Sequence, residues 1–215
     1  MSLILENFVT QSQRWPKSGR VILAQYDADS VVVYQAYCPE IGHAASHSGR
    51  LGGGGFSMSR MTWIKPNFLW MMFRSGWGTK PNQEVTLAIR LKRSAFEEIL
   101  GQAVHSTFVP EVYGTVEAWQ SALRVSDVRL QSDPDHGPSG NPLDRRAIQL
   151  GIRGAVLKRF VHDSILQIED ISPLVEHQRA FVLSRRIDQL DVPQETVYAT
   201  SDTNVADRLG IDVRE

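Results

Sequence analysis

The stretch RVILAQYDADSVVVYQAY at residues 20–37 decides the fold class. It contains two apolar runs rich in β-branched residues, 20–26 and 31–37, on either side of the polar residues 27–30. Asp and Ser favour tight turns because their side chains bond to the nearby backbone. The pattern therefore predicts a β-hairpin at the start of a mainly antiparallel sheet.

Helical and strand-like segments alternate along the rest of the chain, which predicts an α+β fold. Expected strands lie near residues 20–26, 31–37, 85–91, 125–131 and 164–169. Expected helices run from Pro39 to a stop at Gly49, from a cap at Ser94 to about Val104, over Leu143–Val161, and over Ser172–Leu183, with a short helix near Pro66 and a loop over Ser132–Pro142.

The length of 215 residues suits one compact domain, which we place at residues 1–185, with a polar tail at 186–215 packed on its surface. The sheet is expected to be split and flanked by helices. A hydrophobic content of 42% with 22% charged residues is typical of a soluble globular protein. The single cysteine, Cys38, fits a reducing, cytoplasmic compartment. The most apolar stretch, 66–73, is too short to span a bilayer, so no membrane partner is expected.

Charge is unevenly distributed, although the net charge is only −1. Residues 56–93 carry seven basic side chains and one acidic, and residues 143–161 carry five and one. If the fold joins these blocks, Arg60, Lys65 and the pair Arg145–Arg146 form one anion-binding site. The alternative is that both blocks are solvated faces paired with acidic residues.

The segment SMSRMTWIK at residues 57–65 gathers three hydroxyls, two cations and an indole. Hydroxyls suit a ribose, cations suit a pyrophosphate, and a flat ring suits a base. The segment is thus a candidate nucleotide site, and its alternative interpretation is a core strand with polar ends.

Gln167 and Glu169 fall on one face of the strand expected at 164–169, since side chains alternate along a strand. A glutamate on a core strand is costly unless it is paired or functional, so Glu169 is the best candidate for a catalytic carboxylate. The alternative is an exposed residue at the strand end. His43 and His47 are four residues apart but lack the glutamate of a His-Glu-x-x-His motif, so no metal is expected.

The sequence closely resembles the family catalogued as domain of unknown function 4291, over roughly residues 20 to 180. That name implies no activity. The resemblance rests on the runs QYD (25–27), VVVYQAY (31–37), RMTWIKPNFLWMM (60–72), RRAIQLG (145–151) and IEDI (168–171).

The order of the motifs also resembles the ADP-ribosyltransferase superfamily, which implies an ADP-ribosyltransferase-like fold that uses NAD. Gln35 lies where that superfamily usually has Arg or His, Ser57-Met58-Ser59 lies at its Ser-Thr-Ser strand, and Gln167-Ile168-Glu169 lies at its Gln/Glu-x-Glu motif. Glu169 would then stabilise the oxocarbenium-like sugar, and Gln167 would orient the acceptor. The residues implied to hold NAD are Gln35, Tyr37, Ser57, Ser59, Arg60, Trp63 and Lys65.

Three functions follow as hypotheses. The first is an enzyme that transfers ADP-ribose from NAD to a protein or nucleic-acid acceptor. The second is a module that binds nucleotides or nucleic acid without catalysis. The third is an inactive interaction domain. Saturable NAD binding separates the first from the third, and salt-dependent binding of RNA or DNA supports the second.

Overall fold

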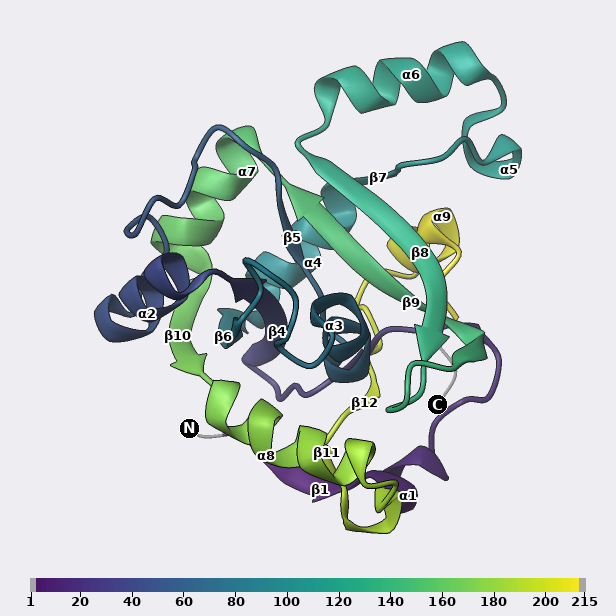
Figure 1. Cartoon of the computed structure of the whole chain (residues 1–215). Helices are drawn as coiled ribbons and strands as arrows, with labels where there is room; N and C mark the ends of the chain where they lie inside the picture. Colours follow the sequence, from purple (N-terminus) through teal and green to yellow (C-terminus); the bar gives the residue numbers. More distant parts are fainter. Residues whose placement is uncertain (1–2, 213–215) are drawn as a thin grey trace.

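The computed structural model of the chain describes residues 3–212 (Figure 1). Its central sheet has three antiparallel strands in the order β10 (Ile165–Asp170), β6 (Val85–Lys92) and β4 (Ser30–Tyr37). β4 and β6 pair over eight residues each, from Ser30 opposite Lys92 to Tyr37 opposite Val85. This long pairing of apolar strands forms the middle of the molecule.

A second sheet is built on the hairpin of β8 (Val128–His136) and β9 (Pro142–Ile152). β7 (Ala103–His105) lies parallel to β8. On the other side of β9, β2 (Gly19–Arg20) pairs parallel near its start and β5 (Thr62–Ile64) pairs antiparallel near its end. The sheet is therefore mixed, with antiparallel pairs in its longest ladder.

The two sheets meet at a single backbone pair between Tyr34 of β4 and Lys65, the residue after β5. The Tyr34 amide donates to the Lys65 carbonyl at 2.7 Å, and the Lys65 amide returns a bond to the Tyr34 carbonyl at 3.1 Å. The α+β class and the single compact body are thus confirmed.

Helices cover both sheets (Figure 1). Between β7 and β8 the chain leaves the main body to form α5 and α6, which project from that body in Figure 1. The helices and turns are α1 (Phe8–Ser12), α2 (Pro39–Ser48), α3 (Phe68–Ser75), α4 (Arg93–Gln102), α5 (Pro110–Tyr113), α6 (Val116–Val125), α7 (Gly154–Arg159), the π-turn η1 (Phe160–Ser164), α8 (Ser172–Leu183), the 3-10 turn η2 (Ile187–Gln189) and α9 (Thr203–Leu209). The short strands are β1 (Leu5–Asn7), β3 (Leu23–Ala24), β11 (Asp191–Pro193) and β12 (Thr196–Val197).

Alternate residues of β4 enter two different hydrophobic clusters, so the central sheet is buried on both faces. Val31 and Val33 belong to a first cluster with α4, α7 and the even-numbered residues of β9. Val32 and Tyr34 belong to a second cluster with α3 and Leu190. The second cluster is the one that positions the site described below.

Several sequence-based expectations need correction. Leu143–Val161 is not one long helix: β9 runs to Ile152, and α7 begins only at Gly154. The first five residues of Ser132–Pro142, expected as a loop, continue β8 to His136. The segment 20–26 is broken into β2, β3 and a bridge at Tyr26 rather than one strand.

The remaining differences concern the ends of elements. α4 starts at Arg93 with Lys92 as its N-cap, so Ser94 is inside the helix, and residues 103–105 form β7. Within 186–212, expected as a polar surface tail, β11, β12 and α9 form, and Leu190 and Tyr198 are fully buried.

Candidate functional site

The side of the second sheet that faces away from the first cluster carries a group of polar side chains that we call the polar face: Trp63, Lys65, Gln131, Asp133 and Gln149. Strand pairing brings them together. Gln131 pairs with Gln149, and Trp63 pairs with Gly151, which places Lys65 beside Gln149 in the same register. Residues paired across a sheet point to the same side, so all five share one face.

Lys65 is the most unusual member of the polar face. Its side chain is nearly enclosed, with 6% of the residue exposed. Its ammonium donates one long hydrogen bond, 3.4 Å, to the Trp63 carbonyl. No ion pair within residues 3–212 involves it. The pKa of Lys65 is lowered to about 7, chiefly by burial and also by repulsion from Arg74, while attraction by Asp133 acts in the opposite direction.

The amides beside Lys65 form a connected network. Gln149 Nε2 donates to Gln131 Oε1 at 2.8 Å and to Asp133 Oδ2 at 3.2 Å. Gln149 is 8% exposed, whereas Gln131 and Asp133 are half-buried. The face therefore presents amide and carboxylate groups that are fixed by one another and reachable from solvent at Asp133.

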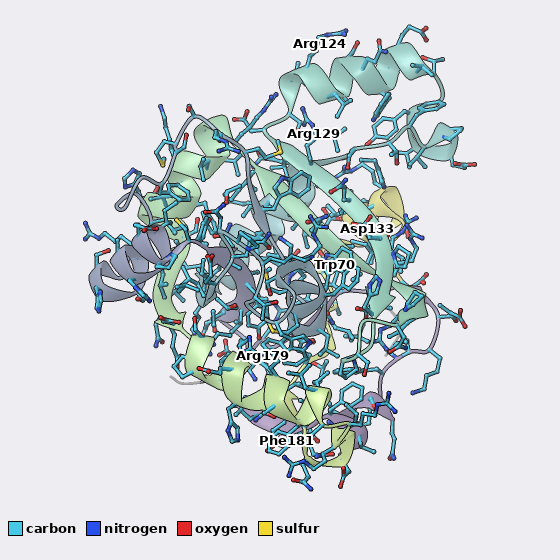
Figure 2. All side chains as sticks on the ribbon, viewed as in Figure 1. Trp70, Arg124, Arg129, Asp133, Arg179 and Phe181 are labelled. Atoms are coloured by element: carbon cyan, nitrogen blue, oxygen red, sulfur yellow. The ribbon has the colours of Figure 1, made fainter. Side chains whose placement is uncertain are left out.

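Aromatic rings lie both within the polar face, at Trp63, and beside it, on α3. Trp63 lies over β9, where a side chain on Gly151 would come within 3.0 Å of its ring. α3 lies against β8, and Figure 2 labels Trp70 and Asp133 on these two neighbouring elements. Trp70 stacks with Phe73 and with His136, each at 5.4 Å between ring centres. Trp70 Nε1 and His136 Nδ1 are buried without a hydrogen-bond partner among the described residues, so both retain bonding capacity.

Behind this face, a buried carboxylate anchors α3. Glu195 accepts from the Phe68 amide at 2.7 Å and from Asn67 Nδ2 at 3.1 Å. Burial raises the pKa of Glu195 well above its usual range, and its bond from Phe68 opposes that shift. Asn67 also caps the helix by accepting from the Trp70 amide. These bonds fix the start of α3, which carries Trp70 and Arg74.

The residues that the sequence assigned to NAD binding are divided between two faces. Gln35 and Tyr37 both contact Thr62 Oγ1, at 2.7 Å and 2.9 Å, on the side of the first cluster. Ser57 and Ser59 form a hydroxyl–hydroxyl contact of 3.0 Å on the nearby loop, and Arg60 is exposed. Trp63 and Lys65 lie on the opposite side, because side chains alternate along β5.

Glu169 and Gln167 lie on β10, at the far edge of the central sheet. Glu169 pairs with Ala88, which pairs with Tyr34, which pairs with Lys65. Three strand spacings separate Glu169 from Lys65, about 14 Å in all. Glu169 instead borders a shallow hollow with Leu3 and Leu174. Gln35 lies opposite Leu87, which pairs with Asp170, so its side chain is on the other face of the central sheet from Glu169, and the structure does not bring these two residues into one site.

Arg145 and Arg146 are neighbours on β9, so they point to opposite faces. Arg145 is 4% exposed and pairs with Asp135 at 2.6 Å. Arg146 bonds to the hydroxyl and the carbonyl of Ser132. The pair Arg145–Arg146, expected to share one positive site with Arg60 and Lys65, is therefore split between the two faces of β9.

Sequence reasoning grouped Trp63 with Lys65 but did not place Gln131, Asp133 and Gln149 beside them. The signal was present as alternation in residues 128–133 and 147–152, where apolar residues 128, 130, 148, 150 and 152 are buried and the intervening residues are polar or small. The helix predicted over residues 143–161 hid this alternation.

No helix within residues 3–212 is long and apolar enough to cross a membrane. No three His, Cys, Asp or Glu side chains among them lie close enough together to hold a metal ion.

Comparison with known proteins gave one family. No curated protein matched the sequence. The family described as "Domain of unknown function (DUF4291)" matches residues 21–198, a range that contains every member of the polar face. The chain therefore belongs to the DUF4291 family.

Proposed function

We propose that the polar face binds a nucleotide, with Lys65 contacting a phosphate. The observation that carries this proposal is the buried Lys65 ammonium, which has no carboxylate partner within residues 3–212. A buried charge without a partner is costly, and a ligand anion would supply the missing partner.

The neighbours of Lys65 fit the rest of a nucleotide. Asp133 accepts hydrogen bonds, as a ribose hydroxyl requires, and it is half-buried rather than enclosed. The Gln131 and Gln149 amides offer both donors and acceptors, which suit the edge of a base. Trp63 provides a flat apolar ring beside them.

Electrostatics favour a phosphate over a neutral ligand. Arg74 repels the Lys65 ammonium, so two cations face the same region. A phosphate between them would relieve that repulsion and raise the pKa of Lys65. Binding is therefore expected to be accompanied by proton uptake above pH 7.

ADP-ribosyl transfer is a further step that the same site would have to support. Glu169 is about 14 Å from Lys65 by strand spacing, so the carboxylate of the polar face is Asp133. NAD is accordingly among the nucleotides to test, and nicotinamide release reports whether transfer follows binding.

Isothermal titration calorimetry with ADP, NAD and ribose 5-phosphate tests the proposal at pH 6.5. Lys65→Met removes the ammonium and keeps a side chain of similar length. Loss of one charge-assisted hydrogen bond, about 1.5–3 kcal/mol, is expected to weaken binding by about tenfold or more. Lys158→Met, which changes an exposed lysine on α7, is the matched control and is expected to bind like the wild type.

Two results would contradict the proposal. One is the absence of binding of all three ligands by the folded wild type at millimolar concentration. The other is equal binding by the wild type and the Lys65→Met protein. Binding of a single-stranded oligonucleotide, with a steep dependence on salt, would assign the face to a polymer instead of a free nucleotide.

A further inference from the structure

A cavity of about 560 Å³ lies where β9 begins, apart from the polar face. Three segments distant in sequence form its wall: α1 with the turn that follows, the β8–β9 turn, and η2. Its volume falls within the range of small-molecule sites. Principal lining residues are Phe8, Trp15, Lys17, Leu143, Arg145 and Ile187.

Trp15 makes one wall of the cavity rigid and apolar. It is 4% exposed, and its Nε1 donates to the Glu195 carbonyl at 2.8 Å. Phe8 packs edge-on against it, with 6.0 Å between ring centres. Leu143 and Ile187 extend the apolar lining, so the wall suits a flat hydrophobic body.

Arg145 provides a fixed cation at this wall. Its guanidinium carbon is 5.0 Å from the centre of the Trp15 ring. Its Nε binds Asp135, and its Nη1 donates to the Pro16 carbonyl at 3.3 Å. Nη2 has no hydrogen-bond partner within residues 3–212, so both of its N–H groups can donate to a ligand.

Two exposed lining residues of the cavity carry charges of opposite sign. Lys17 is exposed, and its ammonium reaches the Ser12 carbonyl at 2.7 Å. Asp144 is also exposed and lies in the same lining. A ligand with one negative charge matches the free Arg145 donor and Lys17, whereas a more highly charged anion would be repelled by Asp144 and by Asp135.

We infer that this cavity is a second binding site, for a small aromatic monocarboxylate. The ring of the ligand packs against Trp15 and Phe8, and the carboxylate of the ligand accepts hydrogen bonds from Arg145 Nη2 and from Lys17. The inference goes beyond the proposed function and uses none of the residues of the polar face, so either can fail alone.

Nuclear magnetic resonance of the tryptophan indole N–H signals tests this site with 2-naphthoate as the probe. The Trp15 signal, assigned through a Trp15→Phe variant, is expected to shift saturably. The neutral analogue 2-naphthol is expected to bind about tenfold more weakly, since it lacks the charge-assisted bonds. Lys17→Met is expected to weaken naphthoate binding several-fold and to leave naphthol binding unchanged.

Variants that fill the cavity with a larger side chain provide a second test, because they should prevent the ligand from binding. Leu143→Trp places a larger ring in the lining and is expected to abolish the Trp15 shift, and unchanged thermal unfolding would show that the variant is folded. Ile187→Trp does the same from the opposite wall if Leu143→Trp fails to fold. Absence of a Trp15 shift up to millimolar naphthoate, equal affinity for naphthol, or full binding by a folded blocked variant would each overturn the inference.

Discussion

Replacing Lys65 with methionine is predicted to stabilise the protein at neutral and acidic pH. The side chain is almost fully enclosed, and its pKa is about 7 in the folded protein instead of the ordinary 10.5. Methionine fills a similar volume without a charge, so the substitution removes the cost of burying the ammonium and loses only a long hydrogen bond to Trp63.

The magnitude follows from the two pKa values. Lowering a pKa from 10.5 to about 7 costs the charged form about 5 kcal/mol. Below pH 7 the lysine is protonated in both the folded and unfolded states, so the wild type bears the whole cost. Between pH 7 and 10.5 the unfolded chain binds the proton and the folded protein does not, so the free energy of unfolding of the wild type rises with pH. Above pH 10.5 the cost is absent.

Urea unfolding of the wild type and the Lys65→Met protein, from pH 6 to pH 10, measures this difference. We expect the variant to be more stable by up to about 5 kcal/mol at pH 6, with the gap closing by about 1.4 kcal/mol per pH unit above pH 7. Titration of other groups cancels in the difference. Lys158→Met should show no such trend, because Lys158 is exposed. A variant less stable than the wild type at pH 6, or a gap that does not vary with pH, would refute the reasoning.

Three further predictions concern the same region. Nucleotide affinity, measured by calorimetry, should fall by up to about tenfold per pH unit above pH 7, because a bound phosphate favours protonated Lys65; a rise with pH would contradict this. Gly151→Ala should destabilise the protein by about 1–3 kcal/mol in urea unfolding, since the added carbon would come 2.6 Å from Met61 Sδ and 3.0 Å from the Trp63 ring, and an unchanged midpoint would exclude these contacts. Asp135→Asn should cost about 3–5 kcal/mol by leaving buried Arg145 unpaired, and a thermal unfolding curve like that of the wild type would argue against the ion pair.

Local signals in the sequence predicted several elements well. α2 starts at Pro39 and stops before Gly49, which has the left-handed backbone that glycine tolerates best. α8 spans Ser172–Leu183 as expected from its Ser-Pro start. These features depend on residues within a few positions of each other, so the chain alone specifies them.

The segment that forms β9 was predicted to be helical because its apolar residues fit both the spacing of a helix and the alternation of a strand. Positions 143, 147 and 150 fit a helix, whereas 148, 150 and 152 fit a strand. Gly151 was the deciding residue, since it weakens a helix and here allows Trp63 to approach the strand. The error in period placed Gln149 on a helix and hid its pairing with Gln131.

Strand order was the other feature that local signals did not contain. Alternation correctly put Gln167 and Glu169 on one face of their strand, as their pairing with Arg90 and Ala88 shows. Their distance from Lys65 depends on β4 and β6 lying between them, which is set by contacts distant in sequence. The candidate carboxylate therefore moved from Glu169 to Asp133 once the strand order was known.

The neighbourhood of Lys65 supports the proposal that its charge serves a ligand. Buried Arg145 has Asp135 at 2.6 Å, and buried Glu195 accepts from Phe68 and Asn67. The fold thus supplies partners to the other buried charges of this region. A cost of about 5 kcal/mol is comparable with the whole stability of many domains, 5–15 kcal/mol, so an unpartnered lysine is expensive unless function requires it. Asp133 attracts the ammonium but forms no ion pair with it, so the proposed phosphate would be the partner that residues 3–212 do not supply to Lys65.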